Sequence, residues 1–565
     1  MFDLIIDNAR LCDGTGAPAF MGSLAVADGR IAAMGDLGGA AGRQRIDAEG
    51  MVLAPGFIDP HTHYDAQLAW DPLVTCSPLH GVTTVLFGNC GVGVAPVRPD
   101  MRHRVMHDLV GVEGIRFEVM QAGIAWQWET FGEYLNHLDR SRLGINVAGL
   151  LAYTPLRHYV MREASLQRAA TPDEMHAMCA IFGRAMKDGA FGFSTSLSQT
   201  HAGEGGRPVA CRNASRDELA AMGRALRPFG RGVIGVALDS AGWNLINDDE
   251  LEVLRVLAGE SGRPVTFLSL LSRPDEPDFH DRSFAKLASL GPLAAQIVPQ
   301  TSARAIVAQC DLRTPSFLAM YPSFQAAIGQ TVARQTEVYA APAFRDAFQA
   351  ELAKRNRTHF IPNMLVLEVA APALAGYVGR TVGEIAAAEG KRAIDMFFDI
   401  AIGDRLQTQF QAAAANYDQA GLARLITDDR VLIGLSDGGA HNDMLCDAGY
   451  TTAVLDIWVR QRRALTLEKA IAKMTSVPAD FIGIADRGRL KPGLAADLVL
   501  FDAQTVCSKT PKFVDDLPGG GRRLIARAEG VAATIVAGRT VCRDGQYTDE
   551  RPGRVLRSGA VQTRG

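Results

Sequence analysis

Short apolar runs recur through the middle of the chain, and each is followed by a stretch with helical patterning. This alternation is typical of parallel strands joined by crossover helices. The runs span residues 56–59, 82–87, 145–151, 189–194, 233–238, 264–269, an indistinct part of 296–309, and 431–435. Eight such units predict an α/β fold, a (β/α)8 barrel, in which the chemistry lies at the carboxyl ends of the strands.

Both ends of the chain have a different pattern, that of short strands joined by tight turns. Asp28-Gly29 and Glu49-Gly50 separate apolar runs near the start, and Asp544-Gly545 does so near the end. Neither end has enough apolar residues to form a core alone. We therefore expect one β-sandwich domain built from residues 1–54 and 487–565, with the barrel spanning 55–486.

A long segment, residues 311–427, separates the seventh and eighth predicted strands. A loop of that length without secondary structure would be improbable in a compact protein. The patterns of Ala341 to Lys354 and of Val382 to Phe398 favour helices. We predict a helical insertion before the last barrel strand, and its role as a lid or a substrate wall stays open.

Two histidines one residue apart follow the first predicted strand. On an extended backbone, the side chains of His61 and His63 point the same way. Both imidazoles can then reach one ion at a strand end, as a catalytic metal site requires. The alternative is a pair of loop histidines without a shared role.

Three motifs carry a resemblance to a known family. Pro-Gly-Phe-Ile-Asp-Pro-His-Thr-His at 55–63 resembles the first barrel strand of the amidohydrolase superfamily. Gly-Asn-Cys-Gly-Val-Gly-Val-Ala-Pro at 88–96 resembles the second-strand loop of its D-aminoacylase (N-acyl-D-amino-acid deacylase) branch, and Ser-Asp-Gly at 436–438 resembles the eighth-strand aspartate. The resemblance covers essentially the whole chain. It implies a barrel with a small β domain and a metal-dependent hydrolase.

The resemblance implies that Cys90 and Asp437 join the two histidines as metal ligands. A thiolate with imidazoles favours zinc over magnesium. Asp437 would also take a proton from water and return it to the leaving amine. The alternatives are a small buried cysteine and an ordinary Asp-Gly turn. The match of 434–438 to G-x-S-x-G is interpreted as chance, since no helix start follows the serine.

The chain also departs from the family. The related enzymes offer histidines at the ends of strands five and six, whereas no histidine occurs here between residues 202 and 279. His201 and Asp239 are the candidates to replace them, and the family's bridging lysine has no clear counterpart. We therefore expect one zinc ion per chain on His61, His63, Cys90 and Asp437, or no ion at all.

Further candidates for metal or substrate contacts lie near the strand ends. His441 closely follows the eighth strand, and Tyr153 and Arg157 follow the third. For each of them a structural or surface role is an equally open interpretation.

Composition excludes several functional classes. A net charge near −4 without a basic block argues against nucleic acid as a partner. The start lacks a signal-peptide pattern, and no apolar run is long enough for a membrane span. Nine cysteines without a C-x-x-C pair indicate reduced thiols, so the cytoplasm is the expected location. Only analogy with the family suggests a homo-oligomer.

The resemblance implies a small-molecule substrate and hydrolysis by metal-activated water. The expected bond is the amide of an N-acyl amino acid or a similar small N-acyl compound. One alternative is a hydrolase of a cyclic amide, a lactone or another small acyl substrate. The other is a catalytically inactive amidohydrolase-like barrel that acts as a binding protein.

Overall fold

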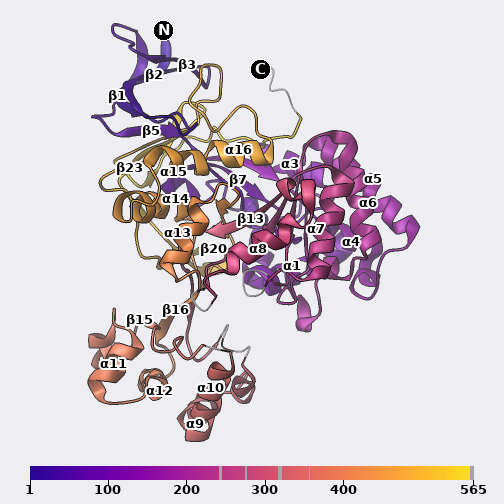
Figure 1. Ribbon diagram of the computed structural model, residues 1–565, viewed down its shortest axis with the longest axis vertical. Helices are drawn as coiled ribbons and strands as arrows, with labels where there is room; N and C mark the ends of the chain where they lie inside the picture. Colours follow the sequence, from indigo (N-terminus) through magenta and orange to yellow (C-terminus); the bar gives the residue numbers. More distant parts are fainter. Residues whose placement is uncertain (241–244, 274–275, 316–317, 319–320, 356, 560–565) are drawn as a thin grey trace. The chain divides into compact units, whose positions relative to one another are not determined.

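The structure is a computed structural model that describes residues 1–240, 245–273, 276–315, 318, 321–355 and 357–559 (Figure 1). It contains two compact units. The first unit comprises residues 1–304, 419–442 and 446–565, and the second comprises 305–418 and 443–445. Each unit has its own architecture.

Parallel strands form the centre of the first unit. The strands are β6 (Phe57–Asp59), β7 (Val82–Phe87), β8 (Asn146–Gly149), β9 (Leu151–Ala152), β10 (Gly192–Ser196), β11 (Val233–Ala237), β12 (Val265–Leu268), β13 (Ile297–Ser302) and β17 (Leu432–Gly434). They pair in the orders β6-β7-β8 and β9-β10-β11-β12-β13-β17. Because β9 continues β8 after one residue, these are eight strand positions. A parallel bridge between Thr62 and Gly438 joins the segments after the first and last of them.

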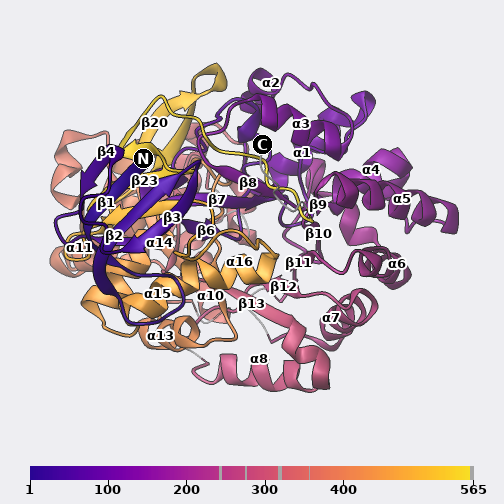
Figure 2. The same cartoon turned by 90° about the horizontal axis from the view of Figure 1, so that it is seen from above.

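The predicted fold class is thereby confirmed, including the indistinct seventh strand, which is β13. Crossover helices follow the strands along one side, as Figure 2 shows for α4 (Tyr153–Met161), α5 (Pro172–Asp188), α6 (Arg216–Leu226), α7 (Asp248–Ser261) and α8 (Phe279–Ala288). Local signals set their ends. In α5, Thr171 and Glu174 form a capping box, and Gly189 ends the helix with a φ of 116°.

The two ends of the chain share one nine-stranded sheet. β5 (Val52–Pro55) pairs with β18 (Leu498–Phe501), so that Leu53 lies opposite Leu500. The N-terminal strands are β1 (Phe2–Leu11), β2 (Phe20–Ala27), β3 (Arg30–Gly35) and β4 (Gly42–Asp47), and the C-terminal ones are β23 (Val531–Val536), β24 (Arg539–Arg543) and β25 (Gln546–Tyr547). Figure 2 shows β1 and β2 side by side, and in the sheet β18 and β5 lie between β23 and β1. Both termini therefore build one small β domain, while its boundaries at 54 and 487 stay predictions.

The second unit is rich in helices, as predicted. Its α-helices within the described residues are α9 (Val332–Ala340), α10 (Pro342–Lys354), α11 (Val382–Glu389) and α12 (Ala393–Gly403). α9 was not predicted, and the helix predicted from Val382 to Phe398 is divided between α11 and α12. Phe324, Tyr339, Phe344 and Phe398 pack edge to face or stacked in its own core. A three-stranded sheet of β14 (Ile306–Cys310), β16 (Gln409–Ala415) and β15 (Leu365–Glu368) was not predicted. The limits 311–427 stay a prediction, and α13 (Gln419–Thr427) lies in the first unit.

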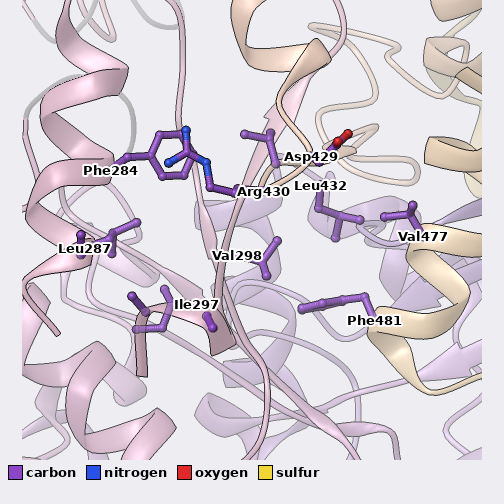
Figure 3. Close-up of a pocket in the computed structure, with 13 residues that line it drawn as sticks. Phe284, Leu287, Ile297, Val298, Asp429, Arg430, Leu432, Val477 and Phe481 are labelled. Atoms are coloured by element: carbon purple, nitrogen blue, oxygen red, sulfur yellow. The ribbon is translucent and has the colours of Figure 1, made fainter. Parts of the chain in front are cut away.

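A cavity of about 570 Å³ lies where β13 and β17 begin, at the amino ends of the strands (Figure 3). Ile297, Leu432 and Phe481 are among its apolar walls. The Arg430 guanidinium stacks on the Phe284 ring at 3.6 Å and is paired with Asp428. This end of the barrel therefore has an apolar hollow with a compensated charge. No helix within the described ranges combines the length and apolarity that a membrane span requires.

Candidate metal centre

The segments after the first and last barrel strands are bound to each other through their backbones. The His63 amide donates to the Gly438 carbonyl at 2.7 Å, and the Ser436 hydroxyl donates to the His61 carbonyl at 3.2 Å. The His61 amide donates to Asp59 at 3.2 Å. Ser436, the serine of the G-x-S-x-G match, is thus buried and holds the His61 backbone through its hydroxyl. These contacts fix both histidines beside Asp437.

Three buried side chains converge at this point. His61 Nε2 and His63 Nε2 are 3.2 Å apart, and Cys90 Sγ lies 3.7 and 3.8 Å from them. Among the described residues this is the only group of three potential metal ligands within 4.8 Å of one another. Zinc bond lengths of about 2.0–2.3 Å in a tetrahedron place ligand atoms about 3.3–3.6 Å apart. The triangle therefore fits one zinc ion.

The loop that presents Cys90 requires glycine. Gly88 has a φ of 82°, and a side chain there would start 2.1 Å from the Leu150 carbonyl oxygen. Cys90 itself has a φ of 55°. Burial raises the pKa of the Cys90 thiol to about 12, against the opposing effect of His63. Because a coordinated thiol loses its proton, the thiolate form at neutral pH requires an ion.

Asp437 approaches the same two histidines from a more open side. Its Oδ1 lies 3.5 Å from His61 Nε2 and 3.7 Å from His63 Nε2. The Asp437 side chain is 29% exposed, whereas each imidazole is 2% exposed. Burial alone would raise the pKa of Asp437, but the hydrogen bond from His63 and the charges of both histidines hold it well below its usual range. The carboxylate is thus the group that an incoming molecule can reach.

Two supporting residues were missed by the sequence analysis. Glu113 ends α1 (Arg102–Glu113), and its Oε1 lies 3.2 Å from His63 Nδ1. Burial raises the pKa of Glu113 to about 8, although His63 opposes this. Burial also lowers the pKa of His61 to about 3, while the charge of Asp437 and the side chain of Gln300 on β13 act in the opposite sense. Partners on the second ring nitrogen orient metal-binding histidines. No motif marks either residue in the sequence.

His201 and Asp239, the candidates to replace the family's histidines at strands five and six, differ from each other in their surroundings. His201 Nδ1 lies 2.8 Å from the Ser196 hydroxyl. Burial, with His63 and His441 acting in the same sense, lowers the pKa of His201 to about 4, so this ring belongs to the electrostatic environment of the site. Asp239 instead accepts a hydrogen bond from the Gln199 amide at 2.6 Å. The His441 amide donates to the carbonyl of Glu113, which places His441 beside the ligands.

Tyr153 and Arg157 are engaged within the protein. Both are fully buried. The Tyr153 hydroxyl donates to Glu218 at 3.0 Å, and Arg157 pairs with the same carboxylate. Arg157 also donates to the Arg168 carbonyl at 2.7 Å. These contacts give both side chains a structural role.

The geometry agrees with comparisons to known proteins. A D-aminoacylase from Alcaligenes xylosoxydans xylosoxydans is 30% identical over 98% of this chain and 97% of its own. An N-acyl-D-aspartate deacylase from the same organism is 30% identical over 99% of this chain and 95% of its own.

Solved structures give the same answer. An N-acyl-D-glutamate deacylase from Bordetella bronchiseptica, in complex with zinc and a phosphonate inhibitor, is 26% identical with a TM-score of 0.66, over 99% of this chain and 100% of its own. A D-aminoacylase structure is 26% identical with a TM-score of 0.65, at the same coverage. That enzyme has a binuclear metal centre in which one metal activates and the second attenuates. The model of the amidohydrolase family matches residues 44–542. The chain belongs to the amidohydrolase family.

Proposed function

We propose that this chain is a zinc-dependent hydrolase that cleaves the amide bond of an N-acyl amino acid with one ion per chain. The convergence of His61, His63 and Cys90, with the Asp437 carboxylate against both imidazoles, is the observation that supports it. Thiolate and imidazole ligands favour zinc.

The relatives support the substrate class. Those matched over the full chain include a D-aminoacylase, an N-acyl-D-aspartate deacylase and an N-acyl-D-glutamate deacylase. All three names describe removal of an acyl group from the nitrogen of an amino acid. N-acyl-D-amino acids are therefore the first substrates to test, with their L counterparts beside them.

Asp437 has the position required of the proton carrier. When bound, a zinc ion supplies a Lewis acid that polarises the scissile carbonyl and acidifies water. Asp437 accepts a proton from the attacking water as the new C–O bond forms. It returns this proton to the nitrogen as the C–N bond breaks, so a carboxylate and an amine leave. His61 and His63 would hold the ion, and Glu113 holds the ring of His63.

The residues at the middle strands support the proposal of a single ion. β11 is followed by Asp239, which is hydrogen-bonded to the Gln199 amide. β12 ends at Leu268 and is followed by serine and leucine residues, which do not replace an imidazole. His201 is held by Ser196 and is not one of the three clustered ligands. These residues leave ligands for one ion.

The test is hydrolysis by the purified protein before and after removal of metal. Release of free amine from a panel of N-acetyl-D-amino acids should occur in the zinc-loaded protein, stop after chelation and return with zinc. Hydrolysis that persists after chelation would contradict the metal-dependent mechanism. A zinc-loaded protein without activity on any acyl compound would favour a binding role instead.

A further inference from the structure

A second cavity, of about 680 Å³, lies in the first unit away from the metal ligands. It is bounded by the hairpin of β20 (Lys512–Leu517) and β21 (Gly521–Ile525), by the turn after β24, and by residues 73–79. The apolar and aromatic side chains of its walls are Leu73, Leu79, Phe513, Val514, Ile525 and Tyr547. A hollow of this size with apolar walls is typical of a small-molecule site.

The charges around this cavity are not balanced. Lys509 pairs with Glu529, and Asp516 pairs with Arg523 through two hydrogen bonds of 2.7 and 2.8 Å. Lys512 and Arg527 also line the cavity. Within the part of the chain that the structure describes, no carboxylate pairs with either of them, and Arg527 donates only to the Gly545 carbonyl, at 3.3 Å.

The cavity at the amino ends of β13 and β17 provides a contrast (Figure 3). There, the lining cation Arg430 is compensated by Asp428 and stacks on Phe284. Apolar walls with a compensated cation do not select an anion. Apolar walls with two uncompensated cations select an anion that carries an apolar tail. The anionic group can pair with the cations at the rim, while the tail displaces water from the cavity.

We infer that this second cavity, lined by the β20–β21 hairpin, binds a monocarboxylate with an apolar tail. The tail occupies the space between Leu79, Phe513 and Ile525, and the carboxylate pairs with Lys512 and Arg527. Arginine can hold a carboxylate through two parallel hydrogen bonds, which suits this head group. The inference does not depend on the proposed hydrolase activity, because binding here requires neither metal nor turnover.

The cavity wall is bonded to the segment that follows the metal ligand Asp437. The Leu524 amide, next to the lining residue Ile525, donates to the Asn442 carbonyl at 2.7 Å. The Asn442 side chain donates to the Gly439 carbonyl at 3.2 Å. A ligand that orders β21 therefore also restrains residues 439–442.

The test is calorimetric titration of the zinc-loaded protein with decanoate. Saturable binding of one decanoate per chain is expected, with a Kd below about 1 mM. Decylamine, which has the same tail and the opposite charge, should bind at least about tenfold more weakly. Amide exchange of Leu524 should slow when decanoate is bound.

Charge-reversal variants locate the ligand. Lys512→Glu and Arg527→Glu should each weaken decanoate binding about tenfold, because each replaces an attractive charge with a repulsive one. Both side chains are exposed, so the fold should be retained. Lys491→Glu is the matched control, because it makes the same charge change at an exposed lysine outside the cavity lining. Unchanged affinity in both cavity variants would place decanoate elsewhere and overturn the inference. Equal affinity for decylamine and decanoate would also overturn it, and so would the absence of decanoate binding to the wild type.

Discussion

Oε1 of Glu113 lies 3.2 Å from Nδ1 of His63, and both side chains are 2% exposed. Glu113 lies on α1, in the segment between the barrel strands β7 and β8. The contact leaves His63 Nε2 free to face His61 and Cys90. A carboxylate behind a metal-binding histidine fixes the ring orientation and strengthens the ligand.

The first prediction concerns this contact. Glu113→Gln keeps the shape and removes the charge, so zinc affinity should fall about 10- to 100-fold, as is usual for such supporting residues. Competition with a chelating dye measures the affinity directly, without an activity assay. Glu118→Gln, on an exposed residue of α2 (Phe117–Gly123), is the control and should leave affinity unchanged. Wild-type affinity in Glu113→Gln would remove Glu113 from the metal centre.

The second prediction concerns the Cys90 proton. Because burial raises the pKa of the thiol to about 12, Cys90 is protonated at pH 7 in the metal-free protein. Zinc binding must then release this proton. Calorimetry in buffers of different ionisation enthalpy should show one more proton released by the wild type than by Cys90→Ala. Equal proton release would show that the thiol is not a ligand.

The third prediction concerns Asp437. Asp437→Asn keeps the shape and removes the basic oxygen, so kcat on the acyl substrate should fall about 10²–10⁴-fold. Substrate affinity should change less. Zinc content must be measured on the same sample, because the carboxylate also faces both imidazoles. Loss of rate with zinc retained supports the proton carrier, whereas full activity with zinc bound would transfer that role to another residue.

The fourth prediction concerns acid stability and His80, a fully buried residue outside the metal centre. Its ring nitrogens lie 2.8 Å from the Thr452 hydroxyl and 3.0 Å from the Ala526 carbonyl. Burial lowers the pKa of His80 to about 4 from the ordinary 6.5. Between pH 6.5 and pH 4, His80 therefore binds a proton in the unfolded chain but not in the native state. The stability associated with neutral His80 is complete above pH 6.5 and is lost as the pH falls towards 4, by about 3 kcal/mol.

Denaturant unfolding of the wild type and of His80→Gln at pH 7 and at pH 4 checks this value. Glutamine does not titrate, so the wild type should lose about 3 kcal/mol more than the variant between these two pH values. Equal losses would mean that His80 is protonated in the native state.

Much of the barrel could be predicted because each strand is a buried apolar run with a clear end. Val82 to Phe87 is both the predicted run and β7 itself. The seventh strand was indistinct because β13 mixes Pro299 and Gln300 with apolar residues. The sheet of the second unit was missed because its strand β16 is rich in alanine, which has little strand preference.

Some residues of the candidate site could likewise be predicted from the sequence, and others could not. The spacing of His61 and His63 after a strand made them candidates, and the resemblance of the motif at 88–96 added Cys90. Glu113 was not predictable, because it lies at the end of a helix without a motif of its own, and only the fold brings it to His63. Tyr153 and Arg157 were selected for their position after a strand. Their common partner Glu218 lies more than sixty residues further along the chain, and only the fold shows that pairing.

The central claim is that one zinc ion on His61, His63, Cys90 and Asp437 makes this chain an amide hydrolase. The most direct measurement titrates zinc into metal-free protein while following hydrolysis of an N-acetyl-D-amino acid. Activity should rise linearly and reach its plateau at one equivalent of zinc per chain. A plateau only at two equivalents, or activity that does not depend on added zinc, would contradict the account.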